Sequence, residues 1–339
     1  MRGVSSERLA PVLFASALLA ASGSAEANGL DRQFLRAVTE NDLYASTYRD
    51  RHYTNGIGFG WSSRPVEDPT HPEQLLDRWL GPDGGKTHFR RSAAFGQLIF
   101  TPEDIATSKP IPSDRPYAGW LYLRGQLESV HRYAGGATRQ AKYGLALGLI
   151  GDISLARKTQ DTWHALIDAQ EPEGWGNQLG NEVAFNLTWQ QAYRTTPIAL
   201  GPAEMDVIPY GAVSLGTANT FAAIGGRMRF SFDLPDDFGP TKLYPDTVGS
   251  DWYTATGFSW YLFAGLETRT VFRDVFLDGN TFRDSMSVDK YAAVADFSGG
   301  IAGIWGPFRL SYQYLWRTDT FTEQNGADRF GSIALDIAF

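Results

Sequence analysis

The strongest constraint on the fold is an alternation of apolar and polar residues that recurs along the chain. In "FRLSYQYLW", Phe308, Tyr312 and Trp316 fall on one face, while arginine, serine and glutamine fall on the other. Successive side chains of a strand point to opposite faces of a sheet, so each run of this kind predicts a β-strand. Other such runs are "NEVAFNLTWQ", "RMRFSFDL" and "GSIALDIAF". The pattern indicates an all-β protein.

The composition of the two faces favours a membrane barrel over a soluble β-sandwich. The apolar faces are rich in Trp, Tyr and Phe, and aromatic residues make up 14% of the chain. Many polar faces carry charged or bulky groups, which suits a barrel lumen better than a flat solvated sheet. The last alternating strand ends with Phe339, which resembles the ending of outer-membrane barrels. We therefore expect a barrel in the cell outer membrane.

The runs predict twelve strands, an even number, as in single-chain bacterial barrels. They cover residues 35–44, 53–62, 91–101, 116–129, 139–151, 181–194, 206–217, 221–234, 257–270, 289–304, 307–317 and 328–339. With a periplasmic amino terminus, the external loops are 45–52, 102–115, 152–180, 218–220, 271–288 and 318–327. Residues 63–90, with a short helical pattern around "HPEQLLDRWL", form a periplasmic connection. The predicted fold is a twelve-stranded antiparallel transmembrane β-barrel with a short helix in an extracellular loop.

The amino-terminal segment indicates export. Residues 1–27 combine early positive charge, an apolar stretch and a small-x-small cleavage site, as in a secretory signal peptide. Residues 28–339 then form a single barrel domain, with no cysteine and no second domain. The net charge of −8 argues against nucleic acid as a partner, and the sequence gives no reason to expect an obligatory protein partner.

The third external loop has the pattern of a helix. Ser154 is a plausible N-cap, and Pro172 and Gly174 stop the pattern. The residues that recur at helical spacing are Leu155, Thr159, Trp163 and Leu166 or Ile167. A helix of about four turns is more than a connector between two strands requires, because long loops are usually functional or disordered.

Unusual polar residues collect at the outer end of the predicted barrel. His164 lies on the loop helix, Asn41 and Asp42 end the first strand, and Thr54 begins the second. The loop with Lys109, Asp114 and Arg115 is external too. Two interpretations remain open: a functional site, or outer loops that are polar only because they face water.

The sequence lacks several familiar catalytic patterns. It contains no G-x-S-x-G elbow, no H-E-x-x-H and no P-loop, and a chain with five His and no Cys is poorly suited to zinc. An oxygen-ligated cation such as calcium remains possible, since Asn, Asp, Thr and loop carbonyls supply suitable ligands.

Several motifs resemble the outer-membrane lipid A 3′-O-deacylase family. They are "TENDLYA", "DRHYTNGIGFGW", "GQLIFTPEDI", "SDRPYAGWLYL", "GLIGDISLARKTQDTWHALI" and "PEGWGNQLGNE". The resemblance implies a twelve-stranded barrel with a site between the outer barrel wall and a loop helix. It also implies calcium-dependent hydrolysis of the ester that carries the 3′ acyloxyacyl chain of lipid A, within lipopolysaccharide.

The resemblance assigns roles to individual residues. Asn41 and Asp42 match the family's Asn-Asp pair, Thr54 its rim hydroxyl, and His164 its proposed general base. Lys109 is the best match to the family's basic residue. Arg115 is the second candidate for the same basic residue of the family.

Two features depart from the family pattern or from regular strand geometry. Where the family has a Glu six residues after the His, this chain has Gln170, followed by Glu171. The helix end could shift by one residue, a backbone carbonyl could take the role, or the site could be altered. Asn41 and Asp42 would point to opposite faces of a regular strand, so for both to serve one site the strand must end or bulge between them. The expected calcium ligands come from Asp42, Asn41, Gln170 and Glu171.

The simplest mechanism has His164 take a proton from water, which attacks the ester carbonyl. Calcium and Lys109 would neutralise the oxyanion, and Asp42 would orient the imidazole or bind the metal. A non-enzymatic pore or adhesin is one rival, unless inward residues fill the lumen. Those residues are Arg124, Gln126, Glu128, Arg227, Arg229, Glu267 and Arg269. A serine-dependent phospholipase, with Ser113 or Ser154 as nucleophile, is the other.

Overall fold

The computed structural model describes residues 31–45, 51–66, 86–254 and 257–339. The predicted signal peptide and the helical pattern around "HPEQLLDRWL" lie outside these ranges. None of the described helices is long and apolar enough to cross a membrane.

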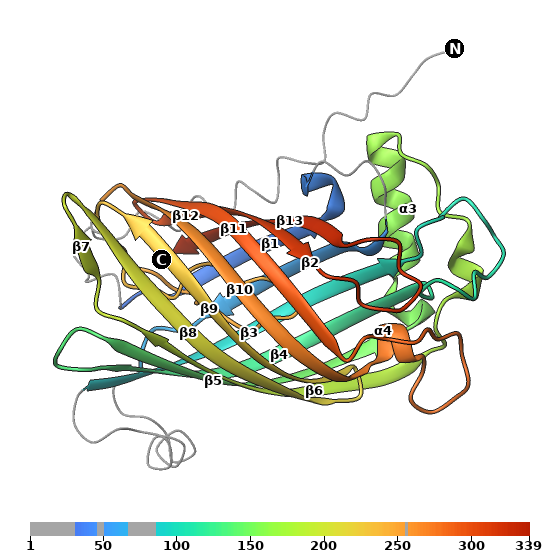
Figure 1. Cartoon of the computed structure of the whole chain (residues 1–339), viewed down its shortest axis with the longest axis horizontal. Helices are drawn as coiled ribbons and strands as arrows, with labels where there is room; N and C mark the ends of the chain where they lie inside the picture. Colours follow the sequence, from blue (N-terminus) through green and yellow to red (C-terminus); the bar gives the residue numbers. More distant parts are fainter. Residues whose placement is uncertain (1–30, 46–50, 67–85, 255–256) are drawn as a thin grey trace.

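The described chain forms a closed antiparallel barrel (Figure 1). Its twelve long strands are β1 (Phe34–Asn41), β2 (His52–Ser62), β3 (Lys86–Thr101), β4 (Ala118–Arg132), β5 (Thr138–Ile150), β6 (Glu182–Arg194), β8 (Ala203–Gly216), β9 (Asn219–Ser231), β10 (Ser259–Asp274), β11 (Ala293–Trp305), β12 (Phe308–Arg317) and β13 (Asp328–Ala338). Pairing of β1 with β13 and of β6 with β8 completes the ring. A short strand, β7 (Ile198–Leu200), pairs only with β8 and was not predicted. The prediction of a twelve-stranded antiparallel barrel is confirmed.

Alternation along each strand separates an exposed outer face from a buried lumen. Along β12, Leu310 and Tyr312 are 45% and 37% exposed, whereas Arg309 and Gln313 are 0% and 3% exposed. Phe308 and Trp316 share the outer face, as predicted. The outward side chains can lie against lipid, and the charged ones are kept inside.

Several strand boundaries differ from the prediction by a few residues. β3 begins at Lys86, so the last five residues of the predicted periplasmic connection 63–90 belong to a strand. Two differences at the external connections have a local cause. β1 ends at Asn41 instead of residue 44, because the Asn41 carboxamide oxygen accepts a hydrogen bond from Leu43 N (2.8 Å) and a 3₁₀ turn, Asp42–Ala45, follows. The strand therefore ends between Asn41 and Asp42, one of the two arrangements that would let both residues serve one site. β10 continues to Asp274, four residues past its predicted end, and the helix α4 (Val275–Asp278) follows it. The external connection is therefore shifted along the chain, and β11 begins at Ala293, four residues after the predicted start.

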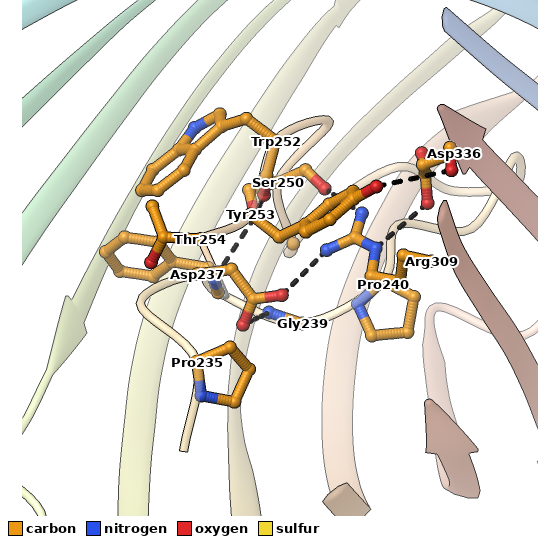
Figure 2. A network of polar contacts seen from close by, with 12 residues as sticks. Pro235, Asp237, Gly239, Pro240, Ser250, Trp252, Tyr253, Thr254, Arg309 and Asp336 are labelled. Atoms are coloured by element: carbon orange, nitrogen blue, oxygen red, sulfur yellow. Dashed lines mark hydrogen bonds and ion pairs between the residues drawn. The ribbon is translucent and has the colours of Figure 1, made fainter. Parts of the chain in front are cut away.

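The connection between β9 and β10 enters the lumen, which the sequence did not predict. We call residues 235–254 the inner strap; most of them are buried inside the barrel (Figure 2). The strap has no regular secondary structure, so its backbone carbonyls need other hydrogen-bond donors. Inward-pointing arginines from the barrel wall supply them, namely Arg36, Arg194, Arg227, Arg309 and Arg317.

Carboxylates of the strap complete this charged interior. Asp237 forms ion pairs with Arg229 and Arg309. Arg309 also pairs with Asp336 of β13 at 2.9 Å, and Figure 2 shows Arg309 between the two carboxylates. All four side chains are 0% exposed. The inward charges listed from the sequence therefore belong to a filled lumen, which opposes the interpretation of the chain as an open pore.

Candidate active site

The helix α3 (Ala156–Ile167) packs on β3 and β4 at the barrel end where the long loops gather (Figure 1). We call this the outer end. The predicted N-cap is wrong: Ser154 belongs to the preceding 3₁₀ turn, and its hydroxyl donates to the carbonyl of Gly151 at 2.6 Å. The N-cap position is Leu155, in a left-handed conformation with φ of 60°. This turn redirects the chain just before the helix.

The buried face of α3 is polar, and its apolar stripe faces outward. A helix that packs on a hydrophobic core has the reverse arrangement. The buried residues are Ala156, Gln160 and His164. Leu155 and Leu166 are 54% and 75% exposed. Gly119 of β4 permits this packing, because a Cβ there would lie 2.2 Å from the Cβ of Ala156.

A groove of about 480 Å³ separates α3 from the outer surface of the barrel wall. Its floor comes from β1, β2 and β3, and its other side from the helix. The lining residues are Asn41, Thr54, Asn55, Ile57, Ile99, Leu155, Lys158, Thr159, Gln160, Thr162, Trp163, His164 and Leu166. The outward stripe of the helix is therefore one wall of this groove.

A β-bulge directs two polar side chains of β2 toward the groove. The register with β3 shifts between Tyr53 and Asn55, so Thr54 and Asn55 both line the groove although they are adjacent. The Thr54 and Thr101 hydroxyls lie 2.7 Å apart and share a hydrogen bond. Asn55 pairs across the ladder with Asn41, which brings two carboxamides side by side.

His164 is held by a backbone carbonyl. Its Nδ1 is hydrogen-bonded to the main-chain oxygen of Gln170, which the chain brings back after a left-handed turn at Asp168 (φ 55°). Because a carbonyl only accepts, Nδ1 is the donor in this hydrogen bond. A backbone carbonyl was one of the three possibilities raised by the missing Glu, and the group hydrogen-bonded to His164 is the main-chain oxygen of Gln170. The Gln170 and Glu171 side chains are exposed.

The other sequence candidates lie elsewhere. Asp42 does not line the groove; its carboxylate accepts a hydrogen bond from Arg51 N at 3.0 Å. Lys109 is exposed in the loop after β3 and does not line the groove either. Arg115 is no substitute for it, because its guanidinium is buried over the Phe100 ring, 4.6 Å from the centroid, and donates to Phe276 O.

Lys158 and Asn55 line the groove and were missed by the sequence analysis. Lys158 lies three residues beyond Leu155 on the same helical stripe, so this spacing was a usable signal. Asn55 could have been found only through the bulge, which the alternation does not reveal. Among the described residues, Lys158 has no ion pair, and the Asn55 Oδ1 is buried without a hydrogen-bond donor.

The groove offers oxygen ligands but few carboxylates. Within the described ranges, no group of three or more His, Cys, Asp or Glu could hold a metal ion. Hard cations such as calcium also take carboxamide and hydroxyl oxygens. Asn41, Thr54 and Asn55 place such oxygens along one side of the groove, and the unsatisfied Asn55 Oδ1 is the observation that fits a bound cation.

The serine candidates for a nucleophile have no catalytic geometry. Ser154 is 0% exposed, and its hydroxyl is engaged by Gly151. Ser113 is exposed in the loop after β3. Neither serine forms a hydrogen bond with His164 in the described structure.

Comparison with known proteins agrees with the fold and the motifs. The family model for outer membrane protein LpxR matches residues 12–339. Among solved structures, LpxR from Salmonella typhimurium is 18% identical, with a TM-score of 0.69, covering 90% of this chain and 100% of that one. The beta domain of the Bordetella autotransporter Brka is 9% identical with a TM-score of 0.43, covering 91% of this chain and 99% of that one.

A search of curated protein sequences gave no significant match. The match to the family model nevertheless covers nearly the whole chain, and the barrel superimposes on a solved structure of that family. The chain belongs to the LpxR family of outer-membrane proteins, the lipid A-modifying family that its motifs resemble.

Proposed function

We propose that the protein hydrolyses the ester of the 3′-O-linked acyloxyacyl chain of lipid A, with His164 as general base. The observation that carries the proposal is the position of His164. The imidazole lines a groove on the outer surface of the barrel, and the hydrogen bond between its Nδ1 and a backbone carbonyl fixes the orientation of the ring. A lipid that diffuses in the outer leaflet can reach such a groove without leaving the membrane.

The groove suits an amphiphile with acyl chains and an anionic head. Leu155, Leu166, Ile57 and Ile99 provide apolar surface for a chain. Lys158 is the charged side chain on the lining in the described structure, and no carboxylate accompanies it there. Its ammonium would bind a phosphate of lipid A or the developing oxyanion, the role first considered for Lys109.

In this mechanism His164 Nε2 takes a proton from a water molecule, whose oxygen attacks the ester carbonyl. The same imidazole then returns the proton to the leaving sugar oxygen, so the acyloxyacyl acid and the free 3′ hydroxyl are the products. Calcium, when bound, would polarise the carbonyl and stabilise negative charge. Asn41, Thr54 and Asn55 would supply its ligands, and Asp42 would hold the turn next to them.

The direct test is the mass of lipid A after incubation with the purified protein in detergent and calcium. We expect loss of one acyloxyacyl unit, abolished by a calcium chelator and insensitive to serine-directed phosphonates. Full activity in chelator together with inactivation by a phosphonate would support the serine phospholipase instead. Unchanged lipid A under all conditions would contradict the proposed function.

A further inference from the structure

The tip of the inner strap lies directly behind the wall that carries the groove. Leu243 N donates to the Glu40 carboxylate at 2.7 Å, and Tyr53 donates to the other oxygen of Glu40, also at 2.7 Å. Glu40 precedes Asn41 in β1, and Tyr53 precedes Thr54 in β2. Asn41 and Thr54 of the groove are thus linked, through the neighbouring residues Glu40 and Tyr53, to the tip of the inner strap in the lumen.

Leu243 also touches the backbone of β2 where the strand has no side chains on its inner face. A Cβ on Gly58 would lie 2.7 Å from Leu243 Cδ2, and one on Gly56 would lie 3.0 Å from Leu243 Cδ1. Ile57, between these glycines, lines the groove on the other side of the strand. The strap tip and a bound substrate would therefore press on opposite faces of the same three residues.

Tyr244 anchors the tip to parts of the barrel other than β2. Its hydroxyl donates to Asp274 at 2.8 Å, and its carbonyl accepts from Arg317 at 3.0 Å. Its ring packs edge-on against Phe100 and Phe276, with centroids 5.4 and 6.0 Å away. The tip is thus held by β3, β10 and β12, and it can act as a fixed support for β2.

We propose that Leu243 is a positioning residue for the outer site. Glycine-rich strand segments are weakly constrained by their own side chains. By holding the Gly56–Gly58 backbone and Glu40, Leu243 fixes the barrel side of the groove relative to His164 on α3. Small displacements of reacting groups cost large factors in rate, so loss of this support lowers turnover without removing any substrate contact. The catalytic consequence rests on the proposed deacylation.

Two matched pairs of variants test the inference. Leu243→Ala removes the support, whereas Val248→Ala removes buried methyl groups from the strap in the core cluster around Phe238 and Trp252. Gly58→Ala pushes against Leu243, whereas Gly60→Ala adds a Cβ whose nearest neighbours are 3.7 Å away, an ordinary contact. We expect Leu243→Ala and Gly58→Ala to lower kcat about tenfold with KM within about twofold, and the two controls to match the parent. Leu243→Met should restore most of the rate.

A second measurement, of the width of the groove, does not depend on deacylase activity. The chain contains no cysteine, so spin labels at Ile57→Cys and Leu155→Cys report the width of the groove by pulsed electron paramagnetic resonance. We expect Leu243→Ala to shift or broaden the distance distribution, and Val248→Ala to leave it unchanged. If wild-type protein is inactive on lipid A, the proposed function fails while this measurement still decides the positioning role.

Three results would overturn the inference. One is parental kcat and parental label distances in Leu243→Ala. Another is an equal effect of Leu243→Ala and Val248→Ala, which would make the strap a general stabiliser only. If Leu243→Ala does not fold, the glycine pair decides, and equal behaviour of Gly58→Ala and Gly60→Ala refutes the positioning role.

Discussion

The lumen and the outer groove use polar residues in opposite ways, although they lie on two sides of the same strands. In the lumen, Asp237 is placed between Arg229 and Arg309, and all three side chains are 0% exposed. In the groove, Lys158 lacks an ion pair among the described residues, and the Asn55 Oδ1 lacks a hydrogen-bond donor. In the lumen the Asp237 network pairs its charges within the chain, whereas in the groove these two groups can be paired by a ligand.

This difference separates stability from chemistry. Buried charges that lose a partner are costly, so the lumen network must stay complete for the strap and barrel to hold together. Polar groups on a groove that meet no internal partner are typical of binding sites, where the ligand completes the hydrogen bonds. Substitutions of polar groove residues should therefore change activity, and substitutions in the charge network of the lumen should change stability.

The largest effect is expected from His164→Ala. Removal of a general base lowers the rate by about 10² to 10⁴, and the loss leaves the strand ladder intact. The measurement is deacylation by lipid A mass, with gel mobility before and after heating as the test of folding. His131→Ala is the control: His131 is bonded to Thr87 across the ladder between β3 and β4, away from the groove. An unfolded His164 variant would show that this histidine is structural and would contradict the proposed difference between groove and lumen.

Asp237→Ala tests the lumen side of the comparison. It leaves the guanidinium groups of Arg229 and Arg309 each short of one buried partner, so we expect destabilisation by about 3 kcal/mol. Denaturant unfolding in detergent measures the loss. Asp161→Ala removes an exposed partner of Arg157 (N–O 3.5 Å) and should change stability by less than about 0.5 kcal/mol. A parental unfolding midpoint for Asp237→Ala would contradict a structural role for the lumen charges.

Lys158→Ala should reduce kcat/KM about tenfold, because the groove then lacks a charged donor for the anionic substrate. The effect should weaken at high salt, and Lys158→Arg should retain most of the activity. Lys109→Ala provides the comparison, since Lys109 is exposed and does not line the groove. A loss in Lys109→Ala with none in Lys158→Ala would restore the assignment first made from the sequence.

Gln170→Ala is expected to change the rate by no more than about twofold, because His164 binds the main-chain oxygen, which every residue possesses. Glu171→Ala, an exposed neighbour, should behave in the same way. Steady-state deacylation rates give the comparison. A loss as large as that of His164→Ala would mean that the Gln170 side chain acts in the site.

The sequence by itself determined the barrel and the identity of the general-base candidate. Alternation has a period of two, and each strand obeys it independently of its neighbours, so strand number, order and lipid-facing residues such as Tyr312 follow from local pattern. The motif around His164 is local as well. The predicted first strand ran to residue 44, and only the structure places its end at Asn41.

Only the tertiary structure decided which cation faces the groove, what holds His164 and what fills the barrel. Lys109, Arg115 and Lys158 are all basic residues of external segments, and only packing puts Lys158 on the groove and Arg115 in the lumen. The carbonyl of Gln170 has no sequence signature, because every residue has one. In the sequence, the strap between β9 and β10 looks like an irregular connection. It enters the barrel because five arginines from four strands bind its carbonyls, a set of long-range contacts that no local pattern encodes.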